Sequence, residues 1–177
     1  YEAPFLFKED DNVLYYQNIQ ASDLGLINVG PARIKYKQVE SIVAPILIKH
    51  GINQTRWNST IVDTSKSESK NNLANLKADS EAELKQALLE MQHYIEMKVI
   101  PFWNMYNDIS KVMPLVNSKT EQELNQGVFQ GVPGIMNRLV IAYKYDKTYY
   151  KEKKEVYLDL IGKQAEKKPN DYVPRFE

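Results

Sequence analysis

The chain has 177 residues, of which 43% are hydrophobic and 26% are charged, ordinary values for one soluble globular domain. Lysine plus arginine equals aspartate plus glutamate at 23 each, so no net charge favours nucleic acid or an anionic membrane as a partner. The absence of cysteine excludes disulfides, thiolate metal sites and cysteine nucleophiles. The longest apolar runs are about a third of the roughly 20 residues that a membrane span needs, which excludes a span.

The first third of the chain is predicted to form a meander of antiparallel strands. Short runs enriched in tyrosine, isoleucine, valine, leucine and phenylalanine alternate with polar or glycine-proline breaks. The predicted strands cover residues 4–8, 13–20, 24–29 and 32–36, and Gly30 with Pro31 separates the last two.

A helix is predicted over residues 37–50, where apolar side chains recur at the spacings of three and four that mark one helical face. Pro45 lies inside this helix and should kink or shorten it, because proline gives no N–H to the preceding turn. Residues 56–63 are predicted to form a further strand. Residues 64–75 are rich in serine, lysine, asparagine and glutamate, which predicts a flexible loop.

The clearest signal in the chain is a stripe of ten apolar residues at alternating spacings of three and four. Such a stripe is about 100° wide and suits a helix that lies along a hydrophobic core. Ser80 and Glu83 match a capping box that opens this helix, and Pro101 and Pro114 should bend or divide it. The stripe consists of Leu84, Leu88, Met91, Ile95, Val99, Phe102, Tyr106, Ile109, Met113 and Val116.

The C-terminal part is also predicted to be helical. Residues 135–145 and 148–161 should form a helical hairpin that Gly162 ends, and residues 163–177 a loosely held tail. All these elements together predict a single α+β domain over residues 1–177. In this domain a long kinked amphipathic helix packs on a small antiparallel sheet, and the helical hairpin follows.

The chain has only two histidines, which limits acid–base and metal chemistry. His50 lies at a predicted helix C-terminus, where a cation interacts well with the last carbonyl groups. Glu90 and His93 resemble half of a carboxylate di-iron site, but such a centre needs this pair twice and two further inward-facing glutamates. The second pair is absent, and His93 lies opposite the apolar stripe. We therefore expect no metal and no other cofactor.

Residues 127–134 contain three glycines and the aromatic Phe129 among valines. The segment is not a phosphate-binding loop, because it follows a predicted helix and lacks the lysine and hydroxyl residue of such loops. We expect a mobile connection between helices, with Phe129 as the apolar anchor of a contact surface. In the alternative interpretation, Phe129 fills the core between two helices.

The segment Ile100-Pro101-Phe102-Trp103 and the segment from Ala142 to Tyr150 resemble a loose group of uncharacterised bacterial domains of unknown function. In those domains a strand-rich half is followed by helices. The resemblance implies a soluble bacterial protein and supplies no catalytic residue. We expect a cytoplasmic location. Because the chain begins with Tyr1, the alternative that an N-terminal segment has been removed stays open.

The missing catalytic constellation favours a non-enzymatic binding module, such as an immunity or adaptor protein, with another protein as its partner. The alternative is a carboxylate-based hydrolase or a small-ligand carrier with a cleft between sheet and helices, since two carboxylates can converge in space without any sequence signature. Converging carboxylates in a cleft would favour the enzyme, and an exposed apolar patch would favour the binding module.

Overall fold

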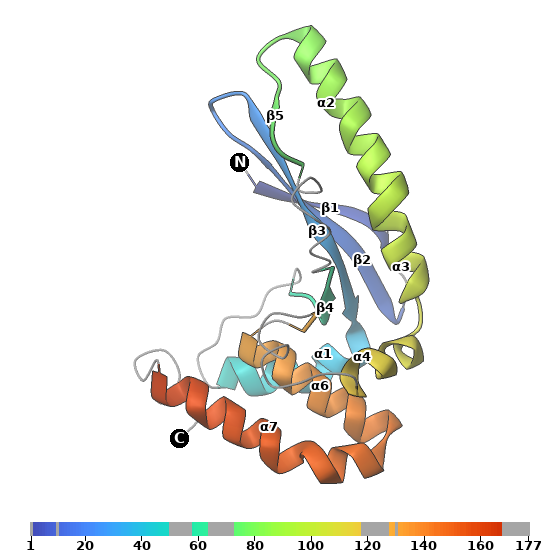
Figure 1. Ribbon diagram of the computed structural model, residues 1–177, viewed down its shortest axis with the longest axis vertical. Coiled ribbons are helices and arrows are strands. Elements are labelled where there is room, and N and C mark those ends of the chain that lie inside the picture. The colour runs from blue at the N-terminus through green and yellow to red at the C-terminus, as the bar shows by residue number, and fades with distance from the viewer. Residues whose placement is uncertain are drawn as a thin grey trace. The chain divides into compact units, whose positions relative to one another are not determined.

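The computed structural model shows an α+β fold, as the order of sequence patterns predicted (Figure 1). The chain divides into two compact units, Tyr1–Ile34 with Val62–Asn107 and Lys35–Ile61 with Asp108–Glu177. The single domain over residues 1–177 stays a prediction. The structure describes residues 2–9, 11–49, 58–63, 73–117, 128–129 and 131–167, without the side chains of 2–7, 131–132, 164–165 and 167.

The sheet is antiparallel where its register is described, and its strand order is β1-β2-β3-β4, with β5 also pairing with β3. Glu2 of β1 lies opposite Gln20 of β2, and Leu26 of β3 lies opposite Lys77 of β5. The predicted meander of β1, β2 and β3 is therefore present. The strands are β1 (Glu2–Glu9), β2 (Val13–Ala21), β3 (Leu26–Tyr36), β4 (Ile61–Val62) and β5 (Leu73–Lys77).

The two strands predicted at residues 24–29 and 32–36 are in fact one strand, β3, so the predicted break was wrong. Gly30 does not turn the chain. A Cβ at this position would lie 3.2 Å from the main-chain oxygen of Asn18 on β2, so the glycine permits a close approach of two backbones. The Gln17 side chain also donates a hydrogen bond of 2.7 Å to the carbonyl of Gly30.

Within the predicted strand at residues 56–63, the described residues 58–63 form a strand only at β4 (Ile61–Val62). The predicted flexible loop at residues 64–75 was wrong at its end, because β5 begins at Leu73; residues 64–72 lie outside the described ranges. Asn75 has a φ of 60° and its N–H donates to Asn28 at 2.8 Å. Because the backbone of β5 is irregular at Asn75, its apolar side chains do not follow the alternation of every second residue by which a strand is identified in a sequence.

The long helix begins as predicted. Ser80 is the N-cap of α2 (Glu81–Tyr94), and its Oγ accepts a hydrogen bond of 3.2 Å from the N–H of Glu83. The Glu83 carboxylate in turn accepts from the N–H of Asp79, also at 3.2 Å. These two bonds satisfy N–H groups at the helix start, which have no partner within the helix itself.

A π-helical turn, η1 (Ile95–Val99), joins α2 to α3 (Ile100–Met105). The N–H of Ile100 donates to the carbonyl of Ile95, five residues back. Pro101 follows immediately and has no N–H to give to the preceding turn, and its ring would clash with a carbonyl in a regular α-helix. The wider turn accommodates the proline, and the helix continues for one more turn.

The predicted helix does not extend to residue 116, because its regular part ends at Met105. Tyr106 leaves the helical conformation, with φ −115° and ψ 35°. Asp108 then caps a new start by accepting the N–H of Ser110 at 2.7 Å. Short polar side chains that bond to nearby main-chain groups compete with a continuous helix at this point. The segments that follow are the 3-10 helix η2 (Ile109–Val112) and α4 (Met113–Asn117).

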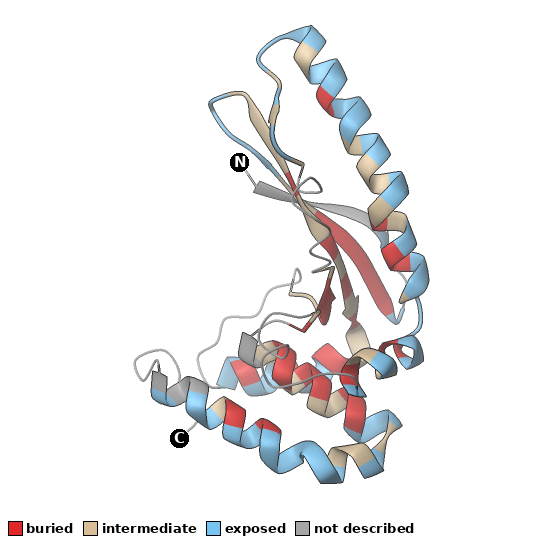
Figure 2. Cartoon of the chain, in the orientation of Figure 1, coloured by how far each residue is buried: buried red, intermediate tan, exposed pale blue. Residues whose placement is uncertain are grey.

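The apolar stripe is buried only in part, which corrects the prediction for its N-terminal half (Figure 2). Leu84 and Leu88 are 41% and 53% exposed, whereas Val99 is 0% exposed. In the first unit, the buried Trp103 donates its indole N–H to the carbonyl of Arg33 on β3 at 3.1 Å. The helix therefore joins the core through η1 and α3, while the face of α2 stays largely open.

The helices of the second unit surround a second group of buried side chains. The helix α1 (Lys37–Lys49) runs through Pro45 and buries Val39, Val43 and Leu47. The helix α6 (Gly131–Tyr145) contacts α1, α4 and α7 (Lys147–Lys167), and its Ile135 packs with Tyr157 and Leu160 of α7. His50, which the sequence placed at the end of the first helix, lies outside the described residues.

Two boundaries in this unit differ from the predictions. The helix α6 begins at Gly131, so the predicted loop at residues 127–134 is helical in its second half. The helix α7 passes Gly162 and ends at Lys167, so the predicted tail at 163–177 is helical at its start. Glycine lowers helix stability by only about 1 kcal/mol, which the packing of the rest of α7 can offset.

Candidate functional site

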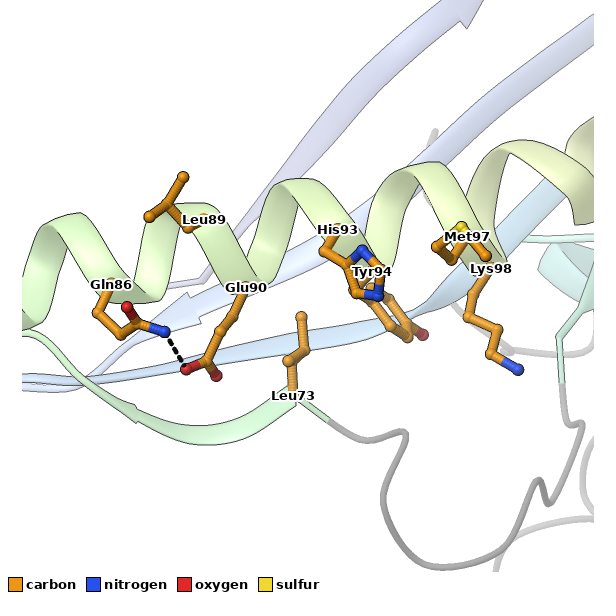
Figure 3. A pocket seen from close by; sticks show the side chains of 8 residues that line it. All are labelled: Leu73, Gln86, Leu89, Glu90, His93, Tyr94, Met97 and Lys98. Atoms are coloured by element: carbon orange, nitrogen blue, oxygen red, sulfur yellow. Dashed lines mark hydrogen bonds between the residues drawn. The ribbon is translucent and has the colours of Figure 1, made fainter.

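The candidate functional site is an open groove between α2 and β5, with a volume of about 340 Å³ (Figure 3). Leu73 of β5 reaches toward the helix on one side of the groove. The other lining residues come from α2 and η1. They form two rows that we call the polar row, Gln86, Glu90, Tyr94 and Lys98, and the outer row, Leu89, His93 and Met97.

The helix geometry explains why these seven side chains share one side. Residues in each row are four positions apart, and side chains four apart lie above one another on a helix. The π turn extends the alignment, because its bonding over five residues brings Lys98 to the same side as His93. The rows thus continue across the point where a proline would otherwise disturb the helix.

The groove is apolar along the outer row and polar along the other. Leu89 and Met97 are both 59% exposed, on either side of the exposed His93. The Glu90 carboxylate accepts a hydrogen bond of 2.9 Å from the Gln86 amide. The polar row also carries two charges of opposite sign, a negative one at Glu90 and a positive one at Lys98.

Tyr94 lines the groove and is half-buried. Burial raises the pKa of its phenol above the ordinary value, and the negative charge of Asp63 raises it further. The hydroxyl group therefore stays protonated at neutral pH. In this form it can donate a hydrogen bond, but it is not a ready base.

The residues that line the groove include neither a pair of carboxylates nor a set of three metal-ligating side chains. Glycoside hydrolysis by carboxylates needs two such groups on either side of the bond, and the groove contains one, Glu90. Glu90 and His93 both line the groove, but within the described ranges no group of three or more metal-ligating side chains could hold an ion. The absence of a cofactor stays a prediction.

A buried polar cluster connects three segments of the second unit, and the sequence did not reveal it. The Thr60 hydroxyl donates to Glu40 at 2.9 Å and accepts the N–H of Tyr36 at 3.0 Å. The Asn137 amide donates to the main-chain oxygen of Thr60 at 3.5 Å. Burial raises the pKa of Glu40, against the opposing effects of the Thr60 hydrogen bond and the charge of Lys35. The cluster is enclosed by the fold and acts as an internal connection.

Phe129 is 3% exposed and belongs to a second buried cluster. The guanidinium carbon of Arg138 lies 5.5 Å from the ring centre of Phe129 and 5.4 Å from that of Tyr157, distances typical of cation–π contacts. Arg138 and the Tyr149 hydroxyl both donate to the carbonyl of Val116. Burial of Phe129 is what the core-packing alternative expects, and its role in a contact surface stays a prediction.

Sequence reasoning missed the groove for two reasons. Leu89 and Met97 lie outside the predicted apolar stripe, so the helical pattern assigns them no role. The segment containing Leu73 is predicted to be a flexible loop. The signal that could have located the groove is the pair of rows at four-residue steps that begin at Gln86 and Leu89.

No known protein family, curated protein or solved structure matches this chain. The resemblance to uncharacterised bacterial domains therefore stays a prediction. Among the described residues, no helix is long and apolar enough to cross a membrane.

Proposed function

We propose that the protein is a non-enzymatic binding module that holds another protein in the groove between α2 and β5, as an immunity or adaptor protein holds its partner. The observation that supports this proposal is the exposure of Leu89 and Met97, both 59% accessible at the edge of a groove. Burying a large apolar side chain is favourable by about 1.5–3 kcal/mol, so a partner that covers both residues gains substantial free energy. Methionine also adapts its shape to different partners.

The groove contributes specificity through its polar row. Glu90 and Lys98 carry opposite charges, and the Tyr94 hydroxyl can donate a hydrogen bond. Polar groups of this kind orient a partner more than they add affinity. A fitting segment is therefore apolar on the side that meets Leu89 and Met97 and carries complementary charges beside them.

A small-ligand carrier is the second candidate function, because a groove of about 340 Å³ lies at the lower end of the roughly 300–1,000 Å³ typical of ligand pockets. The hydrolase alternative lacks support in the groove, where Glu90 has no second carboxylate beside it. The two remaining candidates differ in the size of what they bind.

A selection of peptides displayed on phage tests the proposal, with binding of the selected peptides measured by calorimetry. The Leu89→Asp/Met97→Asp double variant should lose peptide affinity by at least about tenfold, since two apolar contacts are replaced by charges. The control is Leu24→Asp, at a residue 76% exposed in the turn between β2 and β3, which should bind as the parent does.

With the protein kept dilute enough to be monomeric, failure to enrich any peptide, or peptides that bind the double variant unchanged, would overturn the protein-binding proposal. The small-ligand carrier would be favoured instead by two results together. No peptide would be enriched, and the protein would bind one molecule of an apolar dye such as anilinonaphthalene sulfonate, with this binding lost in the double variant.

A further inference from the structure

We infer that a second copy of this chain occupies the groove, with the two α2 helices packed antiparallel about a twofold axis near His93 and Tyr94. The inference rests on the proposed binding function and names its partner. It is supported by the arrangement of apolar and charged side chains along the two rows, which matches itself when the helix direction is reversed.

The apolar contacts are self-complementary. Leu89 and Met97 are eight positions apart with His93 midway between them, a separation of about 12 Å along a helix. When a second copy is placed antiparallel about this midpoint, Leu89 of each copy lies opposite Met97 of the other. A twofold interface requires this reciprocity, in which the same two positions contact each other twice.

The charged side chains follow the same rule. Glu90 and Lys98 are also eight positions apart, with Tyr94 midway between them. The same antiparallel arrangement places Glu90 of each copy near Lys98 of the other, so two pairs of opposite charge form around the apolar contacts. A parallel arrangement would place like charges together, which disfavours it.

Two further features favour this geometry. Antiparallel helices align their dipoles in opposite directions, which is the favourable arrangement for neighbouring helices. The polar row lies beside β5 and the outer row is the more exposed of the two, so a neighbouring helix can reach both (Figure 3). The π turn matters here because it keeps Lys98 in line with the rest of the groove.

Charge reversal combined with sedimentation equilibrium tests the inference on the full chain. Glu90→Lys and Lys98→Glu should each raise the dissociation constant of the dimer at least about tenfold, because each variant brings like charges together twice. When the two variants are mixed, all the facing charges become opposite, so a mixed dimer should form. The double variant Glu90→Lys/Lys98→Glu should likewise dimerise on its own.

The matched control is Glu96→Lys, since Glu96 is exposed, does not line the groove and accepts a hydrogen bond of 2.9 Å from Gln92. This variant should dimerise like the parent. Added salt should weaken the parent dimer and bring the single variants closer to it, because it screens exposed charges.

A parent protein that stays monomeric at every concentration overturns the inference, and so does a mixture of the two single variants that forms no mixed dimer. Formation of the mixed dimer cannot come from a folding defect, since it requires both variants to be folded. A monomeric parent that still binds selected peptides through Leu89 and Met97 would reject the second copy and leave the proposed binding function standing.

Discussion

Replacing Gly134 by alanine should destabilise the protein relative to the same replacement at Gly162. A Cβ at position 134 would lie 2.6 Å from the carbonyl carbon of Phe129 and 3.1 Å from its Cα and oxygen. These are main-chain atoms, which cannot rotate away as the end of a side chain can. At Gly162 in α7, a Cβ would meet nothing within 4 Å.

The magnitude follows from two opposing effects. Alanine is better than glycine inside a helix by about 1 kcal/mol, and both positions are helical. Gly162→Ala should therefore raise the free energy of unfolding by about 1 kcal/mol. At Gly134 the same gain is opposed by overpacking, which costs about 1–3 kcal/mol. The difference between the two variants should thus be about 1–3 kcal/mol and reports the contact with Phe129 alone.

Urea unfolding of the parent and both variants provides the measurement, with the midpoint and slope compared for each protein. Unchanged slopes, with a midpoint for Gly162→Ala above that of the parent and a lower midpoint for Gly134→Ala than for Gly162→Ala, would agree with the prediction. If both variants gained stability equally, the main chain of Phe129 would not lie against Gly134, and the packing described for α6 would be wrong at its start.

Two further predictions test burial and charge. Val99→Asp should lower the free energy of unfolding by several kcal/mol, because it buries an unpaired charge. Leu88→Asp changes an exposed position and should cost no more than about 0.5 kcal/mol. Equal losses for the two variants in urea unfolding would show that the sheet covers the helix along its whole length. Burial raises the pKa of Glu40 above its ordinary 4.5, so the folded state binds its proton more tightly and loses stability as pH rises through the raised pKa. Glu40→Gln should therefore raise the free energy of unfolding more at neutral pH than below pH 4.5. The same gain at both pH values would show that burial does not disfavour the ionised carboxylate of Glu40.

Most helices and strands could be predicted because their patterns are local. The spacing of apolar side chains identified α1, and the Ser80 capping pattern located the start of α2 within one residue. The irregular strand β5 was missed because Asn75, with its φ of 60°, interrupts the alternation of side chains. The break at Tyr106 was also missed, since prolines were expected to divide the helix and an Asp108 cap does so instead.

The part of the long helix that the sheet covers, and the buried polar cluster, depended on information that a single sequence does not carry. The stripe containing Leu88 is as regular as the part containing Val99, yet only the second is covered. Coverage depends on where the sheet ends in space. Similarly, Glu40 and Thr60 are 20 positions apart and Asn137 is far from both, so their hydrogen bonds arise only from the tertiary fold.

The π turn at Ile95–Val99 gives the helix a place where its length can change by one residue. A π turn amounts to one extra residue in an α-helix, so a chain that lost one residue here could regain regular helical spacing without rotating Phe102 or Trp103 out of the core. If the lost residue lay between His93 and Lys98, these two would be four positions apart, the spacing that keeps side chains on one side of an α-helix. Related chains that differ by one residue in this turn should therefore share both the core and the alignment of the groove residues.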